Sequence, residues 1–160
     1  MNTITNKPAK KTSPATLIVS GICALLALLL TLVWFTPVVK IFDDSYTYSE
    51  ILEIAKADEN EVAAFRAVII ISVIMIVWAA IPKLWASIVG VIYMILPAVL
   101  DIGQILDWKS KDVDLAFGGN LIIPLAVLTI IAFIVKLVFV IRDRKQDRNN
   151  AAAYQPLVNM

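Results

Sequence analysis

Residues 17–35 read LIVSGICALLALLLTLVWF and lie inside a longer uncharged run, residues 12–39. A helix needs about 17–25 apolar residues to cross the hydrocarbon core of a membrane. Backbone groups find no water in that core, so a spanning segment must satisfy its hydrogen bonds within a helix. This stretch therefore predicts a first transmembrane helix, which we place at residues 15–38.

The rest of the chain has the same apolar bias. Of its 160 residues, 60% are hydrophobic and 17% are charged, and the mean hydropathy is +0.84. Soluble domains are about 45–50% apolar and about 25% charged. The composition therefore excludes a soluble globular domain, a disordered chain and a fibrous protein.

Three further uncharged runs predict three more spans. Residues 67–82 and 84–100 are separated only by Lys83, and residues 115–135 form the last run. One helix through the middle two runs would be roughly 50 Å long, too long for one crossing, so we expect a tight turn at Pro82-Lys83. The predicted fold is all-α, an integral membrane four-helix bundle running up-down-up-down. Its membrane domain covers residues 14–142, with spans at 15–38, 63–82, 84–106 and 119–141, between tails at 1–13 and 143–160.

Charge predicts the orientation of this bundle. With both termini on one side, that side receives nine of the fourteen basic residues, and the other side receives eleven of the thirteen acidic residues. Basic residues are retained on the cytoplasmic side. We therefore expect a multi-pass protein of the cytoplasmic membrane with both termini, including the basic tail 1–13, in the cytoplasm.

Several residues are expected at the two membrane boundaries. The four tryptophans, Trp34 and Trp108 at one boundary and Trp78 and Trp85 at the other, fit two interfacial belts. Lys136 lies about five residues inside the last span, and a lysine there can extend its amine to the headgroups.

The outer loops contain three helix-start signals. Thr47 and Glu50 have the spacing of a capping box, which predicts a short amphipathic extracytoplasmic helix from about Tyr48 to Lys56. The acidic segment around Asp58 is expected to cap the second span. Asn120 is expected to cap the fourth span, with Pro124 in its first turn.

Asp101 is the sharpest candidate for a functional residue. It lies in the sequence VLDIGQIL near the outer end of the third span, where an ionisable group is a functional hypothesis by default. Pro97, four residues earlier, can kink the helix and open a polar pocket that holds Asp101 and Gln104. Arg66, at the outer start of the second span, is the expected ion partner. The alternative is an interfacial carboxylate that reaches water.

The outer carboxylates are a second candidate site. Asp43 and Asp44 begin an acidic set in the outer loops that could bind a hard cation such as Ca²⁺. The spacing of an EF-hand loop is missing. The alternative is a solvated acidic face without a ligand.

The sequence offers little for catalysis. It contains no histidine and a single cysteine, Cys23, so an internal disulfide, an imidazole-dependent triad and a C-x-x-C redox site are excluded. A lipoprotein signal peptidase needs two motif aspartates that are missing here. We expect no enzyme, no cofactor, no metal and no nucleic-acid partner.

Three short segments give the chain a family likeness. They are Trp34-Phe35-Thr36-Pro37, the basic turn Pro82-Lys83, and Phe117-Gly118-Gly119 at the start of the last span. In this layout the chain resembles small uncharacterised bacterial four-span membrane proteins over most of residues 12–142. The resemblance implies four spans and no particular activity.

Two functions are consistent with these features. The first is a non-enzymatic protein that acts through protein or lipid contacts, as an accessory subunit or an immunity protein against a pore-forming toxin. The second is a small homo-oligomeric channel or transporter component, which needs a polar stripe along a pore. That stripe would have to come from Ser72, Ser87, Asp101, Gln104 and Thr129.

Overall fold

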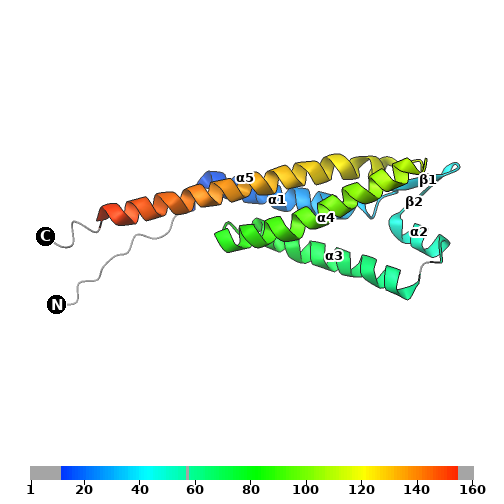
Figure 1. The fold of residues 1–160 in the computed structure, drawn as a ribbon, viewed down its shortest axis with the longest axis horizontal. Coiled ribbons are helices and arrows are strands. Elements are labelled where there is room, and N and C mark those ends of the chain that lie inside the picture. The colour runs from blue at the N-terminus through cyan, green and yellow to red at the C-terminus, as the bar shows by residue number, and fades with distance from the viewer. Residues whose placement is uncertain (1–11, 57, 155–160) are drawn as a thin grey trace.

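The computed structural model describes residues 12–56 and 58–154, which form a long helical bundle with a small hairpin at one end (Figure 1). Residues 1–11 of the predicted basic tail and residues 155–160 lie outside this part. The elements are α1 (Pro14–Val33), β1 (Val39–Ile41), β2 (Asp44–Tyr46), α2 (Tyr48–Ile54), α3 (Glu59–Ala80), α4 (Leu84–Ser110) and α5 (Phe117–Tyr154). Helices α1, α3, α4 and α5 are long and apolar enough to cross a membrane. The predicted all-helical protein with four such helices is confirmed.

The helix boundaries differ most from the predicted spans at the end of α1 and the end of α5. Helix α1 ends at Val33, five residues before the predicted end, because the chain turns at residues 34–36 and continues into β1. Helix α5 continues to Tyr154, well past the predicted end at residue 141. Its extension, residues 142–154, contains three arginines and three alanines, which are good helix formers and need no membrane to remain helical.

The start of α5 also corrects a prediction. Helix α5 begins at Phe117, so Asn120 lies inside it and its side chain donates hydrogen bonds back to Leu115 O and Ala116 O, each at 3.1 Å. Pro124 consequently lies two turns into the helix rather than in its first turn. The predicted roles of Asn120 and Pro124 are wrong because tertiary contacts, described below, fix the helix start three residues earlier.

Three other helices begin with side-chain caps, and the two caps predicted at Thr47 and Asp58 are confirmed. Ser13 caps α1 by accepting a hydrogen bond from the amide of Thr16, and Pro14 occupies the first turn. Thr47 and Glu50 form both hydrogen bonds of the capping box at the start of α2. The carboxylate of Asp58 accepts from the amide of Glu61 at 2.8 Å and caps α3.

Helices α1 and α5 are held together at both ends. At one end, Asp143 of α5 accepts hydrogen bonds from the Ser13 amide at 3.0 Å and the Thr16 hydroxyl at 2.8 Å. At the other end, the Gly118 amide of α5 donates to Pro37 O at 2.9 Å, just beyond α1. The two helices are therefore antiparallel. We call these the Pro82 end, which also contains the α3–α4 turn, and the hairpin end, which contains β1, β2 and α2 (Figure 1).

At the hairpin end, the chain segments form a small hydrogen-bonded layer. Strand β1 pairs with β2 on one edge, with Lys40 opposite Ser45. On its other edge, the Lys40 amide donates to Asp114 O and the Ala116 amide donates to Val38 O. The hairpin is therefore fixed to the segment that leads into α5.

Packing within the bundle is uneven. Helix α5 packs along both α1 and α4, whereas α3 packs along α1 and less extensively along α4. The ring of Phe133 in α5 lies directly over Gly90 of α4, where no side chain intervenes. In α3, by contrast, only Met75 and Ala79 are buried. The weaker packing of α3 leaves room between it and α4.

The sequence suggested that Lys136 extends its amine to the headgroups, but the structure shows a different arrangement. Its side chain is fully buried, and its Nζ donates to Ala79 O at 2.5 Å and to Trp78 O at 3.4 Å. These carbonyls are at the C-terminal end of α3, where helix carbonyls have no partner within the helix and where a positive charge is favourable. Lys136 therefore connects α5 to the end of α3.

Replacing Gly118 with alanine is expected to destabilise the bundle. A methyl group there would overlap Thr36 Oγ1 and the backbone oxygen of Pro37, which the hairpin holds in place. Overpacking of this kind costs about 1–3 kcal/mol, measurable as a lower free energy of unfolding in detergent. Gly21→Ala is the control, because nothing lies within 4 Å of its added methyl group. Equal stabilities of the two variants would contradict the proposed close contact.

Candidate functional site

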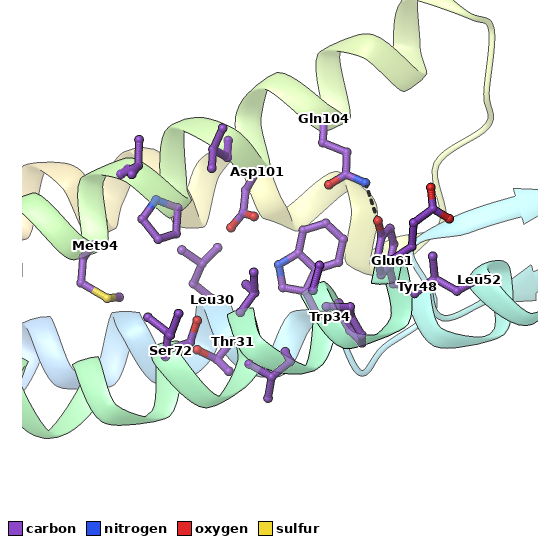
Figure 2. Close-up of a pocket in the computed structure, with 18 residues that line it drawn as sticks. Leu30, Thr31, Trp34, Tyr48, Leu52, Glu61, Ser72, Met94, Asp101 and Gln104 are labelled. Atoms are coloured by element: carbon purple, nitrogen blue, oxygen red, sulfur yellow. Dashed lines mark hydrogen bonds between the residues drawn. The ribbon is translucent and has the colours of Figure 1, made fainter. Parts of the chain in front are cut away.

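The bundle encloses a cavity of about 450 Å³ near the hairpin end, between α1, α3 and α4 and next to α2 (Figure 2). Its lining is mostly apolar, and its polar side chains are Thr31, Tyr48, Glu61, Ser72, Asp101 and Gln104, with the indole of Trp34. We call it the Asp101 cavity. Its volume is within the usual range for small-ligand sites, which are also mostly apolar with a few polar groups.

Asp101 is the central polar group of this cavity. Its carboxyl group points from α4 into the space toward the indole of Trp34 (Figure 2). Among the described residues, Asp101 takes part in no ion pair. Since Lys and Arg are also missing from the lining, the cavity presents a carboxyl group without a cation.

The positions on α4 follow directly from helix geometry. Met94, Pro97, Asp101 and Gln104 are spaced three or four residues apart, so they lie along one face of the helix. Proline leaves the carbonyl one turn earlier without its helical partner. Pro97, Asp101 and Gln104 therefore line one cavity, as the sequence suggested.

Helix α2 covers the hairpin side of the cavity. Tyr48 lies against three aromatic rings, with ring centres 5.1 Å from Trp34, 4.9 Å from Phe65 and 6.0 Å from Trp108. Its hydroxyl accepts a hydrogen bond from Gln104 Nε2 at 3.1 Å, drawn as a dashed line in Figure 2. This aromatic cluster connects α2 to α1, α3 and α4.

The cavity opens to the outside between α3 and α4. Four of its apolar lining residues are also substantially exposed, Val68 and Ile71 on α3 and Leu96 and Leu100 on α4. In a membrane, such side chains would face acyl chains. The rim between α3 and α4 is therefore apolar, and of the polar lining residues only Glu61 is exposed.

The structure does not bring all the predicted site residues together. Arg66 is exposed on α3 and does not line the cavity, so the expected Arg66–Asp101 ion pair is not formed. Phe65, its neighbour, occupies the inward face instead. Because neighbouring helix positions point about 100° apart, only one of the two can face α4.

Asp43 and Asp44 lie away from the cavity, at the turn of the β1–β2 hairpin, and both are exposed. Within residues 12–56 and 58–154, no group of three or more acidic or cysteine side chains is placed to hold a metal ion. Both carboxylates face solvent at this turn, and cation binding there stays a prediction.

The polar stripe needed for a pore is not continuous. Ser72, Asp101 and Gln104 line the cavity. The Ser87 hydroxyl donates to Lys83 O, and the Thr129 hydroxyl donates to Leu125 O, both within their own helices. Three of the five predicted pore residues thus line one cavity, and the hydroxyl groups of the other two form hydrogen bonds within their own helices.

Two important cavity residues were not recognised as such from the sequence. Trp34 was assigned to an interfacial belt, but it is buried in the core beside Asp101. Tyr48 was recognised only as the first residue of a short helix. Its role depends on where α2 docks, and the local sequence carries no signal for that.

Comparisons of the chain with protein-family models, with curated proteins and with solved structures gave no match.

The docking of α2 is expected to weaken in acid. Hydrogen bonds from the Thr47 backbone amide and hydroxyl hold the pKa of Glu50 below its ordinary value. A lowered folded-state pKa stabilises α2 above the unfolded-state pKa, and this contribution is lost as pH falls through the folded value. Amide hydrogen exchange of residues 48–54, corrected for its intrinsic pH dependence, should accelerate over that range. Glu50→Gln should remove this pH response, and an unchanged response would contradict the assignment.

Proposed function

We propose that this chain is a non-enzymatic protein of the cytoplasmic membrane that binds a membrane amphiphile with a cationic, amine-type head group in the Asp101 cavity. The four helices cross the membrane up-down-up-down, with both termini in the cytoplasm and the hairpin end outside. The orientation follows from the excess of basic residues on the side of the termini and of Pro82-Lys83. The cavity then lies in the outer half of the bilayer.

The observation that carries this proposal is the carboxyl group of Asp101 inside an apolar cavity without a cationic partner. Desolvation makes an unpaired carboxylate costly, and a cation that binds beside it recovers part of that cost. Glu61 adds a second carboxyl group to the lining, and no basic side chain of the described chain competes for them. An amine head group would lie near Asp101, and its acyl chain would leave between Leu96 and Val68.

A fluorescent long-chain alkylamine and its N-acetylated neutral form test this proposal with the full chain in detergent micelles. The amine is expected to bind more tightly than the neutral form. Asp101→Asn should weaken amine binding by about ten-fold or more, because hydrogen bonds to charged groups contribute about 1.5–3 kcal/mol. Asp107→Asn is the matched control, since it removes a carboxylate from the same helix outside the cavity, where it pairs with Lys111. Equal affinities of the native chain and Asp101→Asn would reject the proposal.

A second function is favoured by the hairpin. Phe42 at its tip is 95% exposed and has a φ of 56°, a left-handed conformation that is unusual for a bulky residue. The ladder to β2 and to residues 114–116 holds it there. A strained, exposed aromatic side chain on a fixed support suits contact with a protein partner. An accessory subunit or an immunity protein that binds a pore-forming toxin would use such a contact.

Site-directed photo-crosslinking tests this second function. A photoreactive phenylalanine analogue at position 42, in native membranes, is expected to give one discrete adduct with a protein partner. The same analogue at position 53, exposed on α2, is the control. If the partner is a toxin, expression of the chain protects cells from it, and Phe42→Ser reduces this protection. Identical adduct patterns at both positions would contradict a specific contact at the hairpin tip.

A further inference from the structure

The Pro82 end contains a second hollow that the proposed function does not use. It has a volume of about 710 Å³ and lies between the start of α4 and the C-terminal half of α5. Its lining consists of Leu84, Ile141, Arg144, Lys145, Arg148 and Asn149. We call it the basic cleft.

The arrangement of this cleft follows from the unexpected length of α5. Ile141, Lys145 and Arg148 are four and three residues apart, so they share one face of the helix with Arg144. Helix α5 remains helical beyond its apolar run, so this face of α5 extends beyond the position of Leu84, the first residue of α4. The cations are therefore held on a rigid helix beside Leu84.

The cations of the cleft are available for a ligand. Within residues 12–56 and 58–154, the one ion pair joins Lys111 to Asp107 at the opposite end of the bundle. Asp143, the acidic residue nearest in sequence to Arg144, already accepts hydrogen bonds from Ser13 and Thr16. The guanidinium group of Arg142, by contrast, lies over the ring of Phe139 at 4.7 Å and is not part of the lining.

Another hollow, of about 760 Å³, adjoins the basic cleft and shares Leu84 and Arg144 with it. It adds the cation of Lys83 and the indole of Trp85, and it also contains Asp147. Helix α4 begins here without a side-chain cap, so its first amide groups lack a protein partner among the described residues. The basic cleft itself has no acidic lining residue.

We infer that the basic cleft binds the phosphate of an anionic phospholipid. Apolar Leu84 and Ile141 lie where the membrane-spanning segments end, and Arg144, Lys145 and Arg148 lie on the aqueous side of them. A phospholipid has the same order of groups, with acyl chains below a phosphate. Arginine recognises phosphate oxygens through paired N–H donors, and the cytoplasmic leaflet is rich in anionic lipid.

Fluorescence quenching with brominated lipids tests this inference on the full chain in bilayers. Trp85 is half exposed and beside the cleft, so a bound brominated lipid quenches its emission. Brominated phosphatidylglycerol should quench more than brominated phosphatidylcholine at the same mole fraction. Arg144→Gln and Arg148→Gln should each lower the relative affinity for phosphatidylglycerol by up to about five-fold, the effect of one cation near an anionic surface.

Arg142→Gln is the matched control, because it removes one cation from the same helix end outside the cleft, and it should leave the preference unchanged. Equal losses in all three variants would show general surface attraction and overturn the inference, as would no preference in the native chain. Displacement of the lipid by inorganic phosphate at constant ionic strength would identify a free phosphate as the ligand instead. Circular dichroism of each variant checks that the helices are intact.

Discussion

At the hairpin end, the backbone of residues 36–38 lies directly against Gly118 and Gly119, so closely that a methyl group at either glycine would overlap it. This contact brings β1 beside residues 114–116 and starts α5 at Phe117. It also fixes where the hairpin leaves the bundle, and therefore where α2 docks. The cover of the Asp101 cavity thus depends on two residues that have no side chain.

Three charged side chains differ in their relation to the helix ends. Asp143 caps the N-terminal end of α1, and Lys136 donates to the carbonyls at the C-terminal end of α3. In both cases, the charge has the sign that the helix dipole favours. Asp101 differs, since it lies in the middle of a helix face and has no ion-pair partner among the described residues. A structural role explains the first two groups, and the proposed amine ligand would account for the third.

The same packing produces two chemically different ends. Helix α5 contacts α1 and α4 over much of their lengths, so α3 is left at the side with little buried surface. Space between α3 and α4 forms the acidic cavity at the hairpin end. At the Pro82 end, the extension of α5 forms the basic cleft. In the proposed orientation, each leaflet faces the site that suits it, a carboxyl-lined cavity outside and a cationic cleft inside.

The sequence by itself determined the membrane character, the four long helices and the caps of α2 and α3, because hydrophobic runs and capping residues act over a few neighbouring positions. It also singled out Pro97, Asp101 and Gln104, whose spacing places them on one helix face. It could not determine that Trp34 and Tyr48 line the same cavity as Asp101, that Lys136 is buried, or that Arg66 faces away. Those outcomes depend on the rotation and docking of whole helices. Two tertiary contacts decide this docking. One joins Gly118–Gly119 to residues 36–38, and the other joins Asp143 to Ser13, and each connects residues more than 75 positions apart in the sequence.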